Sequence, residues 1–141
     1  MQMCLKDDYT LLIRDVTEEQ ISIIRSWNKM KWNRITRMFS GFADSELLNL
    51  LAEIVRLPEP IEFRRRNLNT IQGAVDQERI RPNPMAAVDY PVSMNLFQHQ
   101  VRAANMALLT FGMISPKEVE EKYARRKKPD SISSESEKEN Q

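Results

Sequence analysis

Residues 25–39 read RSWNKMKWNRITRMF, and the conformation of this stretch decides which fold class the whole sequence predicts. It holds two tryptophans and five cations and no acidic residue. Upstream, Thr17 begins TEEQ, a sequence typical of the capping box that starts a helix. Gly41 is a typical helix end. The sequence therefore predicts one long helix over residues 18–39.

On a helical wheel this segment has an apolar side and a basic side. The apolar side gathers Ile23, Ile24, Trp27, Met30, Ile35 and Met38. Arg25, Lys29 and Arg37 lie on the opposite side, which is polar and positively charged. Trp32 falls at the border, where its ring either covers the edge of the core or stacks on a base.

The rest of the sequence predicts four more helices and one candidate strand. The helices run from Asp44 or Ser45 to Pro58, over residues 62–80, from Ser93 or Asn95 to Phe111, and onward from Pro116. Residues 9–14, YTLLIR, are β-prone but have no neighbouring hairpin partner, so a strand there requires a distant segment or another subunit.

We therefore predict a mainly α fold, a compact bundle of about five helices in a single domain over residues 1–128. A short N-terminal β-strand is the one candidate addition to this bundle. Residues 129–141 hold four acidic residues, one basic residue and a single isoleucine, too little apolar surface to offset the entropy of ordering. We predict a disordered acidic, serine-rich tail there.

Composition indicates an intracellular protein. The net charge is only +1, although residues 1–128 hold 20 basic residues against 16 acidic ones. Cys4 is the single cysteine, which precludes an internal disulfide. Two aspartates interrupt the N-terminus where a signal peptide requires an apolar run, and no stretch is long enough to span a membrane. The basic run RRKK, starting at Arg125, resembles nuclear import signals, so both cytoplasm and nucleus fit.

The sequence does not predict an enzyme. His99 is the only histidine, and a structural role is its default interpretation. The sequence contains no glycine-rich phosphate loop, no recognisable nucleophile motif and no carboxylate pair at a motif spacing. We expect no catalytic residue, no cofactor and no metal site.

The basic segments favour a non-catalytic protein that binds DNA or RNA through phosphate contacts, either alone or as an oligomer. The predicted contacts are Arg25, Lys29, Trp32, Arg37, Arg64, Arg65 and Arg66. Salt bridges from the three consecutive arginines to Glu59 and Glu62 are an equally weighted alternative. The competing function is a protein–protein adaptor or assembly factor that docks a partner through apolar, methionine-bearing helix surfaces. An acidic protein partner and a homo-oligomer are both expected from these surfaces.

Overall fold

The structure is a computed structural model that describes residues 1–127, and in this range it has five helices and a four-stranded antiparallel sheet. The fold is therefore mixed α/β: the five predicted helices are present, but a four-stranded sheet stands where the sequence predicted a mainly α bundle with one candidate strand. The chain divides into two compact units, Met1–Thr70 (unit 1) and Ile71–Gln141 (unit 2), with the boundary inside helix α3. This division does not test the predicted single domain over residues 1–128. The predicted tail, residues 129–141, lies outside the described residues.

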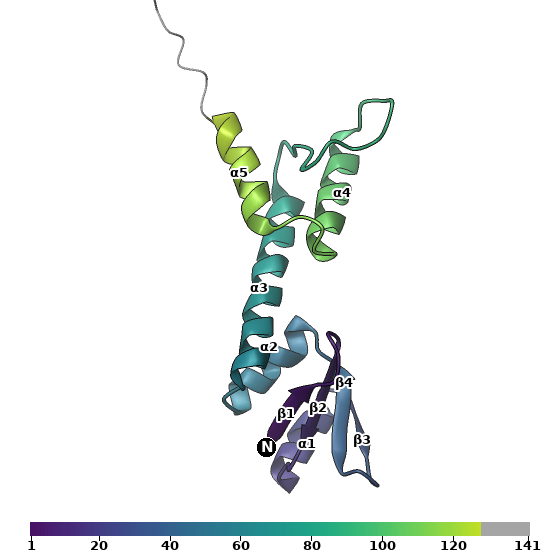
Figure 1. Cartoon of the computed structure of the whole chain (residues 1–141), viewed down its shortest axis with the longest axis vertical. Coiled ribbons are helices and arrows are strands. Elements are labelled where there is room, and N and C mark those ends of the chain that lie inside the picture. The colour runs from purple at the N-terminus through teal and green to yellow at the C-terminus, as the bar shows by residue number, and fades with distance from the viewer. Residues whose placement is uncertain (128–141) are drawn as a thin grey trace, which may run out of the picture. The chain divides into compact units, whose positions relative to one another are not determined.

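The sheet belongs to unit 1 and has the strand order β1-β2-β4-β3 (Figure 1). Its strands are β1 (Gln2–Leu5), β2 (Thr10–Arg14), β3 (Met30–Asn33) and β4 (Met38–Phe42). The candidate strand in residues 9–14, whose state the sequence left open, forms β2. It pairs with β4, a distant segment, and also with β1, a hairpin partner that the sequence pattern did not indicate.

The predicted long helix over residues 18–39 is wrong beyond its first turns. Helix α1 (Glu18–Ser26) starts with the expected capping box at Thr17, but the chain then turns through Asn28, whose φ is 55°. A β-hairpin follows, and the Asn33 side-chain oxygen stabilises its turn by accepting the backbone N–H groups of Ile35 and Thr36. Turn-forming asparagines at both points explain why the helix does not continue.

In this hairpin the side chains alternate between the two faces of the sheet, so the faces expected from a helical wheel do not form. Met30 and Trp32 face the core, and Trp32 lies opposite Phe39 with ring centroids 4.7 Å apart. Gly41, expected to end a helix, lies inside β4. A side chain there would come within 2.9 Å of the Lys29 carbonyl oxygen, so the close approach of two backbones requires glycine.

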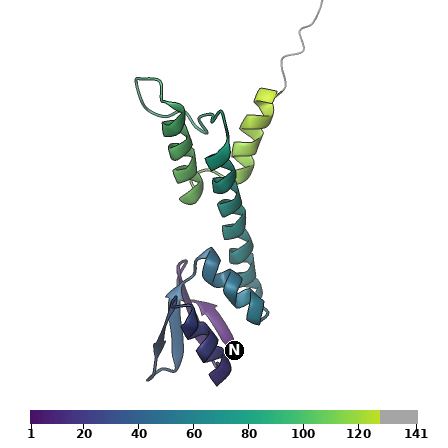
Figure 2. The same cartoon turned by 180° about the vertical axis from the view of Figure 1, so that it is seen from behind.

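Helices cover one face of the sheet. Helix α2 (Ser45–Ile54) begins at the Asp44 cap, as predicted, and helix α3 (Glu59–Ile80) follows. The core of unit 1 joins the sheet to α1, α2 and the start of α3, and includes Leu11, Ile13, Ile24, Phe39, Leu47, Leu48, Leu51 and Ile61. Helix α1 lies behind the sheet in Figure 1 and in front of it in Figure 2, which shows the reverse view.

Unit 2 packs the second half of α3 with helix α4 (Gln98–Thr110) and helix α5 (Pro116–Lys127). Helix α4 starts at Gln98, later than the predicted Ser93 or Asn95. Helix α5 starts where predicted, with Ser115 and Glu118 capping each other's backbone N–H groups. The buried apolar residues are Val75, Ala87, Leu109, Ile114 and Val119. Among the described helices, none is long and apolar enough to cross a membrane.

Candidate functional site

Lys29, a predicted contact, is held within unit 1 by two carboxylates. Its Nζ lies 2.6 Å from Glu46 and 3.1 Å from Asp44. Hydrogen bonds to Glu46 and then to Asp44 raise the pKa of Lys29. Because Asp44 also caps α2, Lys29 fixes the hairpin to that helix, and its charge is largely compensated.

Two of the three consecutive arginines are also compensated. Arg65 lies 2.7 Å from Glu62 and Arg66 lies 3.0 Å from it, so the salt-bridge alternative is confirmed for Glu62. The hydrogen bond from Arg65, assisted by the one from Arg66, lowers the pKa of Glu62 to about 2. Arg65 also donates to Asn49 of α2, which ties α3 to α2.

Trp32 and Arg64 have local contacts of different kinds. The half-buried Trp32 ring packs against Phe39 at the edge of the core, which fits the structural alternative for this residue. The Arg64 guanidinium carbon lies 5.9 Å from the centre of the Tyr9 ring, and its Nε donates to the Ala43 carbonyl at 3.4 Å. Arg64 therefore has contacts different from those of Arg65 and Arg66, which pair with Glu62, although it directly precedes them in sequence.

The remaining predicted contacts, Arg25 and Arg37, are exposed and have no acidic partner in the part of the chain that the structure describes. Arg37 belongs to a segment that we call the cationic hairpin, residues 30–42, which comprises β3, its turn and β4. Lys31 and Arg34, which sequence reasoning missed, lie in the same hairpin. They too are exposed and form no ion pair with described residues. The structure therefore groups Arg37 with two new cations and separates it from Arg64, Arg65 and Arg66.

The hairpin turn places a large apolar side chain between two arginines. Ile35 is 94% exposed, and Arg34 and Arg37 flank it in the turn. No acidic residue occurs anywhere in residues 20–43. An exposed turn with positive charge and an apolar tip can contact an anionic surface without first breaking an ion pair of its own.

Unit 2 contains a different kind of polar cluster, centred on two fully buried side chains, Glu78 and Asn105. Asn105 donates to Glu78 at 2.8 Å and to the Met85 carbonyl at 2.6 Å. Its oxygen accepts the Ala87 N–H and the Tyr90 hydroxyl. One amide therefore fixes the loop between α3 and α4 to both helices.

Aromatic and cationic groups complete this cluster. Tyr123 of α5 donates its hydroxyl to Glu78 at 2.9 Å, and the Arg81 guanidinium lies 3.7 Å from the centre of the Tyr123 ring. Arg81 also approaches Glu78 at 3.3 Å and pairs with Glu120. Burial, followed by the charge of Glu78, raises the pKa of Tyr90. All of these groups find partners inside unit 2, which is the pattern of a structural network.

The loop held by Asn105 presents apolar side chains at the surface. We call residues 88–97 the apolar loop; Val92, Met94 and Phe97 in it are all exposed, Met94 at 80%. His99, expected to be a structural residue, is exposed in the first turn of α4, and its ring stacks on Phe97 at 5.8 Å. Among residues 1–127 there is no group of histidine, cysteine, aspartate or glutamate side chains that could hold a metal ion.

Comparisons with protein-family models, with curated proteins and with solved structures give no match to this chain. The function is therefore inferred from the geometry of the two surfaces, the cationic hairpin and the apolar loop.

Proposed function

We propose that this chain is a non-catalytic nucleic-acid-binding protein whose cationic hairpin contacts phosphates. One observation carries the proposal. The hairpin and the end of α1 present Arg25, Lys31, Arg34 and Arg37, and in the described part of the chain none of these cations is paired with an acid. By contrast, Lys29, Arg65 and Arg66 are compensated by carboxylates.

This difference matters because phosphate binding draws its free energy from the release of counterions by cations that are free to approach the backbone. A lysine that already holds two carboxylates contributes little to such binding, since a phosphate would have to compete with them. The proposed contacts are therefore Arg25, Lys31, Arg34 and Arg37, in place of the larger set that the sequence predicted.

Fluorescence anisotropy with a labelled oligonucleotide tests the proposal. Four phosphate contacts predict a slope of about −3 in log affinity against log salt, a loss of about 60-fold between about 50 and about 200 mM salt. Removing two contacts with the double variant Arg34→Ala/Arg37→Ala should reduce the steepness of that slope to roughly half. The variant should stay folded, because both side chains are exposed.

The matched control is Arg56→Ala/Arg125→Ala, which removes the same net charge from exposed positions outside the hairpin that form no ion pair among the described residues. If the control weakens binding as much as the hairpin variant, the attraction is a general charge effect and the hairpin is not the site. Absence of binding to single strands and duplexes at about 50 mM salt rejects the proposal altogether.

A second candidate function, the protein–protein adaptor, is favoured by the apolar loop. Val92, Met94 and Phe97 are exposed in one segment, which the hydrogen bond from the Tyr90 hydroxyl to Asn105 anchors. The adaptor surface would lie on this loop, and only partly on the methionine-bearing helix surfaces first expected. Binding through it should be nearly insensitive to salt and lost in Met94→Asp, while Arg34→Ala should leave it unchanged.

A further inference from the structure

One face of the sheet in unit 1 carries no helix. Leu11, Ile13 and Phe39 point toward the helices and are fully buried, so the residues alternating with them face the other way. The uncovered face, which we call the open face, consists of Gln2, Cys4, Thr10, Leu12, Arg14, Lys31, Asn33, Met38, Ser40 and Phe42. It carries two cations and no acidic residue.

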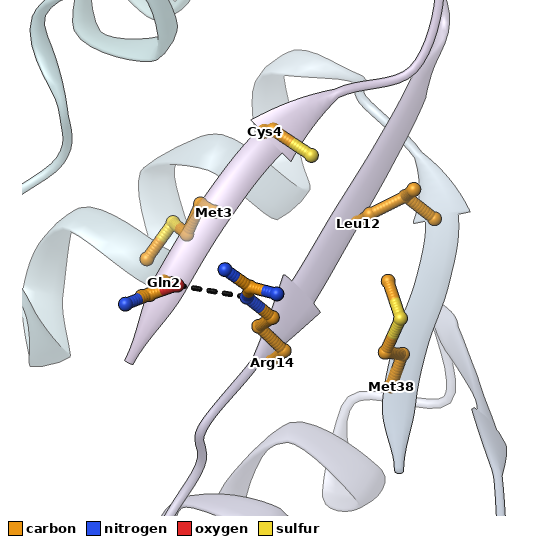
Figure 3. A pocket seen from close by; sticks show the side chains of 6 residues that line it. All are labelled: Gln2, Met3, Cys4, Leu12, Arg14 and Met38. Atoms are coloured by element: carbon orange, nitrogen blue, oxygen red, sulfur yellow. Dashed lines mark hydrogen bonds between the residues drawn. The ribbon is translucent and has the colours of Figure 1, made fainter. Parts of the chain in front are cut away.

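Figure 3 shows the part of the open face that forms a shallow pocket. Cys4, Leu12 and Met38 come from three neighbouring strands there, and Arg14 donates to Gln2 at 2.8 Å. Arg14 and Met38 also line a second pocket that reaches Arg37 in the turn of the hairpin. The open face is therefore continuous with the cationic hairpin.

Two aromatic rings stand at one end of the open face. Tyr9 and Phe42 are stacked with their planes 3° apart and their centroids 6.1 Å apart, and each is 61% exposed. Arg64 approaches Tyr9, as described above. The pair belongs to neither buried cluster, and since Arg64 lies over the Tyr9 ring, the flat surface offered to a planar ligand is mainly that of Phe42.

The register of the sheet connects these rings to the cations. Phe42, Ser40 and Met38 alternate along β4 on the open face, and Lys31 lies directly opposite Ser40 on β3. Four residues of strand span about 13 Å, enough for a short run of nucleotides. Arg14 pairs with Asp15 at 3.8 Å beside this track, whereas Lys31 meets no acid among the described residues. Aromatic rings beside a track with exposed cations form the kind of surface on which single-stranded nucleic acids stack their bases.

An acidic side chain at the aromatic end limits where the phosphates of a bound nucleic acid can lie. Asp7 lies in the turn beside Tyr9, where it accepts the backbone N–H groups of Tyr9 and Thr10 at 2.8 and 2.7 Å. Those hydrogen bonds lower the pKa of Asp7 and keep it ionised. Phosphates should therefore avoid this turn and run from Phe42 toward Lys31 and the hairpin, with a base over the rings.

Resting on the proposed function, we propose that the open face binds single-stranded nucleic acid in preference to duplex, with a base stacked on the Tyr9–Phe42 pair. A duplex keeps its bases stacked within the helix and offers phosphates alone, so it gains nothing from the rings. The chemistry is common to single-stranded DNA and RNA, and the test uses both.

Anisotropy titrations of the full chain with a single-stranded DNA, a single-stranded RNA and a duplex of matched sequence test this. The variant Tyr9→Leu/Phe42→Leu keeps apolar bulk while it removes the flat rings. It should bind both single strands about 5- to 100-fold more weakly than the parent and bind the duplex within about 2-fold. Tyr9→Phe, which keeps the ring, should bind like the parent, and circular dichroism confirms that each variant is folded.

The two proposals fail in different ways. If the parent binds single strand and duplex equally, or the leucine variant keeps its preference, while Arg34→Ala/Arg37→Ala still weakens binding, the open-face inference is wrong and the phosphate-binding function stands. If the parent binds none of the three probes, both are wrong. Loss of single-strand affinity in the leucine variant alone, with duplex binding kept, supports the inference.

Discussion

The buried cluster of unit 2 and the cationic hairpin of unit 1 use their arginines in opposite ways. In unit 2, Arg81 pairs with Glu78 and Glu120 and covers the Tyr123 ring, and Arg102 donates to the Arg81 carbonyl. In unit 1, Arg34 and Arg37 extend from a hairpin turn and meet no acid among the described residues. Arg81 and Arg102 are thus part of a polar network inside unit 2, whereas Arg34 and Arg37 of the hairpin remain available to a ligand.

This contrast separates residues that maintain the fold from residues available for binding. Removing an inward-directed charged group should cost stability and, in a folded molecule, leave phosphate binding unchanged. Removing an exposed cation of the hairpin should have the opposite effect. Variants in each unit can therefore test this separation.

The largest effect is expected at Glu78. Glu78→Ala removes the acceptor shared by Asn105 and Tyr123 and leaves Arg81 without its buried partner. Breaking a buried charged pair costs about 3 to 5 kcal/mol. Amide hydrogen exchange should show lost protection in α4 and α5, and nucleic-acid affinity per folded molecule should not change.

Asp76→Ala is the control for Glu78, because Asp76 lies on the same helix but is exposed. It should change stability by no more than about 0.5 kcal/mol. If Glu78→Ala is equally mild, the cluster is not what holds unit 2 together, and the contrast between the units fails.

A comparable loss is expected in the apolar core of unit 1. Leu51 is fully buried on α2, and Leu51→Ala should cost about 2 to 5 kcal/mol through lost packing and the cavity left behind. Hydrogen exchange should locate the loss in the sheet and α2, with Glu53→Ala, on the exposed side of α2, as the silent control. A silent Leu51→Ala would mean that this face does not form the core.

A smaller, pH-dependent effect is expected at Glu62. Its folded-state pKa of about 2 lies below the ordinary value of 4.5 for a glutamate, so its ion pairs with Arg65 and Arg66 stabilise the fold above about pH 4.5. That contribution is lost as pH falls from about 4.5 to about 2. Urea unfolding should therefore find the parent more stable than Glu62→Gln at neutral pH, with the difference vanishing in acid; a difference independent of pH would contradict the assignment.

Helix boundaries with strong local signals could be predicted from the sequence. The capping box at Thr17, the cap at Asp44 and the Ser115–Pro116 start are all confirmed, because each depends on contacts within one turn. The sequence offered β2 as a candidate strand that needs a distant segment or another subunit, but it could not identify β4 as the partner, since strand pairing depends on contacts distant in sequence.

The hairpin is where sequence reasoning failed. Met30, Ile35 and Met38 fit one side of a helical wheel, and the period-two alternation of residues 30–33 is too short to outweigh that pattern. Asn28 and Asn33 were the available turn signals. This error also displaced the predicted site, because a helical face groups Arg37 with Lys29, whereas the hairpin groups it with Lys31 and Arg34.

The central claim is that the cationic hairpin of unit 1, and no surface of unit 2, meets nucleic acid. The most direct measurement is an NMR titration of the isotope-labelled full chain with a short single-stranded oligonucleotide, following every backbone amide. We predict that the largest chemical-shift changes fall in residues 30–42 and that they are suppressed by raising the salt concentration. Changes concentrated in the apolar loop, residues 88–97, or no changes at low salt, would contradict this account.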